Sequence, residues 1–131
     1  MARRDYSDDD DFYEQDFEKK GVLSAWVSID TRRENEDVDT LQDLCGVGYY
    51  RLSDQESNHL DYQLIGLASL LADLSYSKTY MNSVVSAARE KGIENARWVV
   101  VQYDFAYDPA AVTRTVEADP IFLGVFEYSD E

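Results

Sequence analysis

The sequence predicts an α+β fold: a mostly antiparallel (mixed) sheet of about 4–6 strands with two main helices packed on one face. The stretch Trp98–Tyr103 is β-branched and aromatic, contains no glycine or proline, and is apolar on both faces. Such a run is typical of a strand buried on both sides. Leucines at helical spacing fill the middle of the chain, between strand-like runs at either end, which indicates helices layered on a sheet.

The N-terminal half begins with a predicted strand over Val22–Ile29, in which apolar residues alternate with serines and one tryptophan. A short amphipathic helix is expected over 38–45, ending at Gly46. Residues 47–52 carry two tyrosines and predict a short strand. The polar stretch 53–61 is expected to be a loop or the entry to a helix.

Two longer helices are predicted next. Gln63–Leu74 places its leucines on one face. Ser77 is a suitable N-cap for a second helix that Gly92 ends.

The last part of the chain is expected to hold two neighbouring core strands. These are Trp98–Tyr103 and Ile121–Tyr128, joined by the acidic, tyrosine-bearing loop Asp104–Asp119. Within this loop, residues 112–117 alternate well enough to form an extra edge strand.

The length of 131 residues suits one domain. Residues 1–20 are rich in charge, and we expect a mostly mobile acidic tail followed by a single α+β domain over 21–131. The N-terminus lacks the apolar core of a signal peptide, and no run approaches the length of a membrane span. A cytoplasmic protein that does not enter membranes is therefore the expectation.

Charge is the most prominent feature of the composition. Twenty-seven acidic residues against twelve basic ones give a net charge of −15. The first twenty residues contribute a net charge of only −4, and the remaining −11 belongs to residues 21–131. The acidity is therefore a property of the domain itself. A protein of this kind repels nucleic acid and anionic membranes and attracts basic partners, although solubility alone is another explanation.

No catalytic, cofactor or metal site is predicted. The single cysteine, Cys45, follows an apolar residue and is expected to be a buried structural thiol. The single histidine, His59, lies in a polar stretch and is expected to be exposed. One histidine and one cysteine exclude a His/Cys zinc cluster, and the scattered arginines disfavour nucleic-acid binding. The chain is therefore not expected to be an enzyme.

Two acidic groups remain as candidates for partner binding. Asp104 and Asp108 bracket Tyr107 directly after the predicted core strand, where loop residues often carry function. Asp54, Glu56 and Asp61 form the second group. For both groups a solvated loop is the ordinary alternative.

Several segments, taken in order, resemble a family of bacterial proteins that protect against toxins. They are Leu23–Val27, Asp43–Val47 with Tyr49 and Tyr50, Val99–Tyr107 with its core strand and following tyrosine, and Ile121–Tyr128 with its Phe-x-Gly-x-Phe-x-Tyr pattern. The family is the polymorphic-toxin immunity protein family 22, and the resemblance spans roughly residues 22 to 128.

This resemblance implies that the chain binds and neutralises a cognate bacterial toxin domain. Many toxin domains are basic where they hold substrate, and an acidic protein meets such a surface with complementary potential. Tyrosines flanked by carboxylates serve well as interface anchors. From charge and loop position, the residues expected to bind the partner are Asp54, Glu56, Asp61, Asp104, Tyr107 and Asp108.

Three other functions are compatible with the same residues. An acidic DNA mimic or regulator of a host nucleic-acid-binding protein uses the same electrostatics with a different partner. A small enzyme could use the carboxylates of the Asp104–Asp108 loop, and this function requires an apolar pocket around a perturbed carboxylate. A structural module without a ligand is the third.

Overall fold

The computed structural model describes residues 17–29, 41, 45–47, 50–60, 63–112 and 120–129. Its strands are β1 (Glu18–Ser28), β2 (Gln55–His59), β3 (Ile65–Gly66), β4 (Asn95–Ala96), β5 (Trp98–Phe105) and β6 (Ile121–Glu127). Its α-helices are α2 (Leu67–Leu71) and α3 (Ser77–Glu90), and two short 3-10 turns are η2 (Leu52–Asp54) and η3 (Pro109–Ala111).

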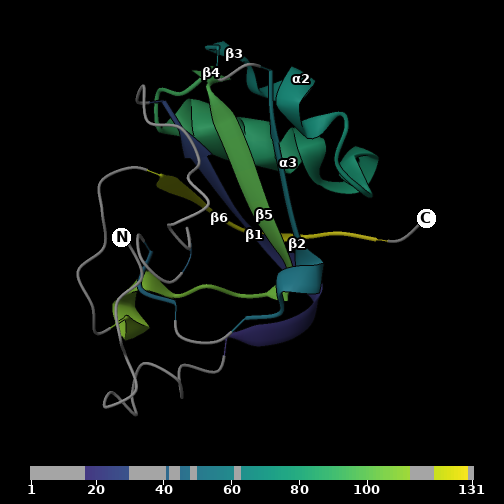
Figure 1. The fold of residues 1–131 in the computed structure, drawn as a ribbon, viewed down its shortest axis with the longest axis vertical. Helices are drawn as coiled ribbons and strands as arrows, with labels where there is room; N and C mark the ends of the chain where they lie inside the picture. The colour runs from purple at the N-terminus through teal and green to yellow at the C-terminus, as the bar shows by residue number, and fades with distance from the viewer. Residues whose placement is uncertain are drawn as a thin grey trace.

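The main sheet has four strands in the order β2-β5-β1-β6, and each neighbouring pair is antiparallel. Strands β3 and β4 form a separate antiparallel pair. Both α-helices cover one face of the main sheet (Figure 1). The predicted α+β class, with two helices on one face of an antiparallel sheet, is therefore confirmed.

The two central strands are β1 and β5, and both are buried on both faces over most of their length. This confirms the central position predicted for Trp98–Tyr103. The prediction that this strand neighbours Ile121–Tyr128 is wrong, because β1 lies between β5 and β6. A strand with two apolar faces is most stable in the centre of a sheet, where both faces are buried. Strand β6 leaves Val125 39% exposed and therefore suits an edge.

The sheet separates two apolar clusters. On the helix side, the face of β1 that carries Ala25 and the face of β5 that carries Val101 pack against Leu70 and Val84 of the helices. On the opposite side, Trp26 and Val100 pack with aromatic side chains and with the described residues of the 41–47 segment. Burial on both faces explains why such a short sheet can support a core.

The polar stretch predicted to be a loop over 53–61 contains a strand instead. Strand β2 pairs with β5 along its whole length, from Gln55 opposite Gln102 to His59 opposite Trp98. Its position at the edge of the described sheet permits polar side chains, because strand preference depends more on pairing and burial than on residue type. His59 is accordingly half-buried in a strand, and the prediction of an exposed loop histidine is wrong.

The prediction of a strand over 47–52 is also wrong for those of its residues that the structure describes. Tyr50 and Arg51 lie outside regular structure, and Leu52 begins the turn η2. Most of the predicted helix over 38–45 and of the predicted edge strand over 112–117 lies outside the described residues. Cys45 is buried, as expected.

The predictions of the two helices differ in accuracy. Helix α3 runs from Ser77 to Glu90 and ends at Lys91–Gly92, as predicted. Helix α2 is much shorter than the predicted Gln63–Leu74, because Ile65 and Gly66 are extended and pair with β4. The predicted cap is also wrong, since Tyr76 occupies the N-cap position and the hydroxyl of Ser77 bonds to the carbonyl of Ala72.

The domain begins before the predicted boundary at residue 21. Strand β1 starts at Glu18, and the side chain of Phe17 is only 6% exposed, within the cluster around Trp26. The backbone amide of Ala106 donates a hydrogen bond of 2.6 Å to the carbonyl of Phe17. Residues 17–20 therefore belong to the folded domain, and the rest of the predicted tail lies outside the described residues.

Asp104 interrupts the regular alternation of β5. Val101 and Tyr103 point to the helix side, so strict alternation would send Phe105 there as well. Phe105 instead joins the cluster on the opposite side. Asp104 has a positive φ of 55°, and the register with β1 shifts at this point, from Leu23 opposite Tyr103 to Glu18 opposite Phe105. The extra residues of this irregularity lie in β1, between Glu18 and Leu23, and the positive φ of Asp104 turns the end of β5 over to the other face.

The buried hydroxyl of Ser24 fixes the chain after this irregularity. It donates a hydrogen bond of 2.8 Å to the carbonyl of Phe105 and accepts one of 2.9 Å from the amide of Tyr107. The hydroxyl of Tyr107 in turn donates to the carbonyl of Cys45 at 2.7 Å. Since Ser24 is fully buried, water cannot replace these bonds.

Replacement of Ser24 by alanine is therefore expected to destabilise the protein by about 1–3 kcal/mol, because a buried amide and a buried carbonyl lose their partner. Ser57→Ala, at an exposed position of β2, is the matched control and is expected to change the free energy of unfolding by less than about 0.5 kcal/mol. Urea denaturation measures both. Equal stability of the two variants would contradict this assignment.

Candidate functional site

Four tyrosines gather where the C-terminal ends of β5 and β6 meet the start of α3. They are Tyr76, Tyr80, Tyr103 and Tyr128, and the carboxylates of Asp54, Glu56 and Asp104 interact electrostatically with members of this group. We name these seven residues the tyrosine–carboxylate edge. They come from four separate segments of the chain, so only the folded protein assembles them.

The rings are in direct contact. Tyr76 stacks on Tyr128 with ring centroids 5.7 Å apart and planes 25° from parallel. Tyr103 meets both of these rings edge to face, at 5.9 Å from Tyr76 and 5.1 Å from Tyr128. Tyr80 contacts Tyr103 from the helix side. Aromatic contacts of this kind hold rigid rings in defined positions, and Tyr76 remains 44% exposed.

The hydroxyl groups of the two inner tyrosines form a short network with the backbone. Tyr103 donates a hydrogen bond of 2.6 Å to the carbonyl of Ser75, and its oxygen lies 3.0 Å from that of Tyr80. The amide of Ser75 donates to Oε1 of Glu56 at 2.8 Å. Strand β2 is thereby tied to the turn that precedes α3.

Asp104 organises the outer part of the edge. Its Oδ1 accepts hydrogen bonds from the amide of Gly21 at 3.0 Å and from the hydroxyl of Tyr128 at 2.7 Å. The amide of Tyr128 donates to the carbonyl of Gly21 at 3.1 Å, which closes the group. Gly21 has a φ of 86°, a conformation that glycine adopts without strain.

Burial controls the protonation of these tyrosines. Burial raises the pKa of Tyr103 well above its ordinary value, and the hydrogen bond with Tyr80 raises it further. Burial also raises the pKa of Tyr80 and of Tyr128, in the latter case together with the hydrogen bond to the Asp104 carboxylate. All three hydroxyls are therefore protonated at neutral pH and act as hydrogen-bond donors.

Two residues of the edge hold a left-handed backbone. Tyr76 has a φ of 60° and Asp104 a φ of 55°, and no other non-glycine residue in the described part of the chain has a positive φ. Aspartate tolerates this conformation, but for an aromatic residue it is unusual. Such strain persists only where surrounding contacts impose it, and it concentrates at binding and catalytic sites.

Two open hollows adjoin Asp104. One, of about 570 Å³, is lined by Lys20, Gly21, Tyr76, Asp104, Tyr128 and Ser129. The other, of about 190 Å³, is lined by Glu18, Lys19, Lys20, Arg51, Asp54 and Asp104. Both are polar and open to solvent, unlike the enclosed apolar pockets that bind small molecules. They are suited to side chains of another protein.

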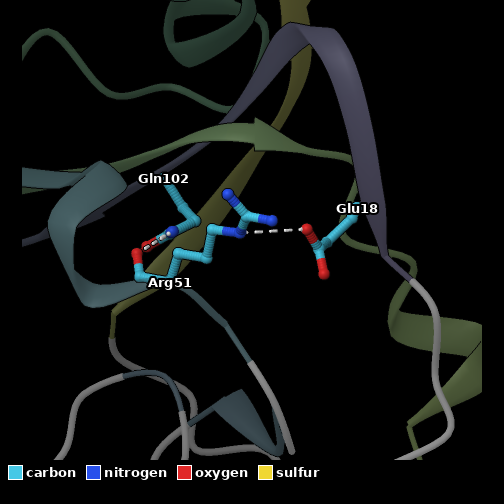
Figure 2. Close-up of polar contacts among 3 residues, drawn as sticks. All are labelled: Glu18, Arg51 and Gln102. Carbon is cyan, nitrogen blue, oxygen red and sulfur yellow. Dashed lines mark hydrogen bonds and ion pairs between the residues drawn. The ribbon is translucent and has the colours of Figure 1, made fainter.

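An ion pair crosses the smaller hollow. Nε of Arg51 lies 3.4 Å from Oε2 of Glu18, and the buried side chain of Gln102 donates a hydrogen bond of 2.7 Å to the carbonyl of Arg51 (Figure 2). Both charged side chains are largely exposed, so the pair contributes little stability. Acidic and basic residues are thus mixed in this hollow, which is less uniformly acidic than the sequence predicts.

Three of the six residues predicted to bind a partner come together in this edge: Asp54, Glu56 and Asp104. Tyr107 does not, because its ring lies in the core beside Trp26 and Phe122 and is only 3% exposed. The prediction that Tyr107 is an interface anchor is wrong, since the chain after Asp104 places its ring in the core. Asp108 is exposed at the start of η3, where its carboxylate accepts a hydrogen bond from the amide of Ala110, and Asp61 lies outside the described residues.

Sequence reasoning missed all four tyrosines of the edge as members of a site. Their positions in the sequence show no shared pattern, because one precedes a helix, one lies within that helix, one lies near the end of a strand and one follows another strand. The general signal was the ratio of ten tyrosines to five phenylalanines, which favours half-buried aromatic surface.

The part of the chain that the structure describes contains no group of three or more histidine, cysteine or acidic side chains placed to hold a metal ion. Within the same residues, no helix is both long and apolar enough to cross a membrane.

Comparison of the chain with models of protein families finds no match. Searches of curated proteins and of solved structures likewise return none. The resemblance to immunity protein family 22 stays a prediction from the sequence.

Asp104→Ala is expected to destabilise the protein by about 1–3 kcal/mol, because alanine resists the left-handed backbone and cannot accept the two hydrogen bonds. Asp104→Asn keeps an acceptor oxygen and tolerates the same backbone, so a loss below about 1 kcal/mol is expected. Thermal or urea denaturation measures both. A similar loss for both variants would contradict this explanation, because asparagine keeps both the acceptor oxygen and the tolerance for the left-handed backbone.

Stability is expected to fall as the pH rises above about 10, the ordinary tyrosine pKa. The raised pKa values of Tyr80, Tyr103 and Tyr128 mean that the folded protein keeps protons that the unfolded chain loses. The stabilisation is fully present below the unfolded pKa and is lost as the pH rises through the folded values. Urea denaturation at pH 8 and above pH 10 should show this, with a smaller pH dependence in Tyr103→Phe. The same dependence in both proteins would contradict it.

Proposed function

We propose that this chain is an immunity protein that binds a cognate bacterial toxin domain in the cytoplasm and neutralises it through the tyrosine–carboxylate edge. The observation that carries the proposal is the assembly of Asp54, Glu56 and Asp104 around a rigid cluster of tyrosines in which Tyr76 is exposed and Tyr128 half-buried. Aromatic anchors with nearby charges are the usual composition of a binding hot spot.

Net charge supports a basic partner. The chain carries −15 in total, and this field attracts a cationic surface before contact and accelerates encounter. A toxin that holds an anionic substrate has such a surface, and a protein bound there blocks access to it. The resemblance to immunity protein family 22 points to the same class of partner.

The site also argues for binding rather than catalysis. Its hydroxyl groups are engaged with the backbone and with carboxylates, and their pKa values are raised, so none is prepared to act as a nucleophile or base at neutral pH. The hollows are open and polar, without the enclosure that favours chemistry. We therefore propose a non-enzymatic inhibitor.

The first test uses the gene adjacent to the one that encodes this chain. If that gene encodes a secreted protein with a toxic C-terminal domain, co-expression of this chain is expected to restore growth, and the two purified proteins should form a stable complex. Survival without a complex, or a complex without protection, would contradict direct neutralisation. Capture of basic host DNA-binding proteins, displaced by DNA, would favour the DNA-mimic function instead.

A pair of charge variants tests the proposed face. The triple variant Asp54→Asn, Glu56→Gln and Asp104→Asn removes three charges from the edge, and it is expected to weaken toxin binding about tenfold or more and to reduce its salt dependence.

The matched control, Asp73→Asn with Glu90→Gln and Glu94→Gln, removes the same charge from exposed positions elsewhere. Its affinity is expected to stay within about twofold of wild type. Calorimetry at two salt concentrations measures both triple variants. Equal weakening would show that only net charge matters and that the edge is not the interface.

A further inference from the structure

The larger hollow beside Asp104 offers a specific chemical environment. Tyr76, Tyr128 and Asp104 all line it. Tyr76 is 44% exposed, and its stacking on Tyr128 fixes the orientation of both rings. An aromatic wall next to a carboxylate attracts a flat organic cation, through the negative face of the ring and through charge.

Asp104 is prepared to accept such a cation. Both of its hydrogen bonds from described residues, those of Gly21 and Tyr128, use Oδ1. Its Oδ2 therefore has no hydrogen-bond partner among the described residues. The carboxylate is held rigidly by one oxygen and can accept a hydrogen bond at the other, so its preorganisation lowers the entropic cost of binding.

We propose that this hollow receives an arginine side chain of the partner protein, with the guanidinium against the tyrosine rings and a hydrogen bond to Oδ2 of Asp104. This inference rests on the proposed function, because it names the contact through which the toxin is bound. Arginine fits better than lysine, since its planar group stacks on aromatic rings and keeps donors for a carboxylate. A metal ion fits poorly, because the described residues contain no set of ligands for one.

Lys20 also lines the hollow and supplies an internal test. It is exposed and makes no ion pair with Asp104 within the described part of the chain. Its positive charge opposes a guanidinium at close range. Removal of this charge should therefore strengthen arginine binding, whereas removal of the Asp104 charge should weaken it.

The probe is Nα-acetyl-arginine methylamide, titrated into the purified full chain and followed by the NMR signals of the Gly21 amide and the tyrosine rings. A dissociation constant on the order of 10 mM is expected for a single side chain. The citrulline analogue has the same shape without the charge, and it is expected to cause no comparable shifts. Equal shifts with both compounds would overturn the proposal.

Variants locate the contact. Asp104→Asn and Tyr76→Asn keep residues that tolerate a left-handed backbone, and each is expected to weaken arginine binding at least about threefold. Lys20→Gln is expected to strengthen it about twofold. Glu90→Gln, at an exposed position at the end of α3, is the control and should leave it unchanged. An unchanged affinity in Asp104→Asn, with the fold intact by NMR, would overturn the proposal.

The same variants separate this inference from the proposed function. If Asp104→Asn and Tyr76→Asn leave toxin affinity at the wild-type value, the arginine contact is wrong although the immunity function stands. If arginine binds as expected but no toxin is neutralised, the hollow is a cation site and the immunity function is wrong.

Discussion

The backbone reversal at Asp104 is the constraint on which the rest of the structure depends. With a positive φ at this residue, β5 changes face before its last residue, and Phe105 and Tyr107 enter the second core instead of the helix side. That second core gives the sheet apolar material on both faces. One conformational exception therefore determines which of the two cores receives Phe105 and Tyr107.

The same residue links the fold to the proposed site. Its Oδ1 accepts hydrogen bonds from Gly21 of β1 and from Tyr128 after β6, so one carboxylate joins the first half of β1 to the segment that follows β6. Tyr128 then supports Tyr76, whose strained backbone keeps its ring at the surface. A rigid aromatic surface beside an anchored carboxylate loses little entropy on binding, which is the property required of an interface anchor.

Sequence patterns predicted the features that depend on local periodicity. The buried strand Trp98–Tyr103 and the helix Ser77–Glu90 follow from alternation and from a helical stripe. The order of the strands is a long-range property, and alternation alone does not show that β1 separates β5 from β6. The polar strand β2 escaped prediction because pairing, rather than apolar residues, makes it a strand.

The candidate site was predictable only in part for the same reason. The three carboxylates of the edge were expected from their charge and loop positions. Tyr107 was expected at the surface as well, but it is buried in the second core, after the backbone reversal at Asp104. No sequence pattern predicts the backbone reversal at Asp104, since aspartate is common in ordinary loops and turns. The tyrosines of the edge come from distant segments, so their proximity is a consequence of the fold.

Hydrogen exchange of the Gly21 amide tests the role of Asp104 most directly. Gly21 is exposed to solvent, yet its amide donates a hydrogen bond to the Asp104 carboxylate. If that bond organises the strand ends, the amide should exchange at least about tenfold more slowly than an unstructured glycine. Exchange at the unstructured rate would contradict the account, because the carboxylate would then not be anchored to β1.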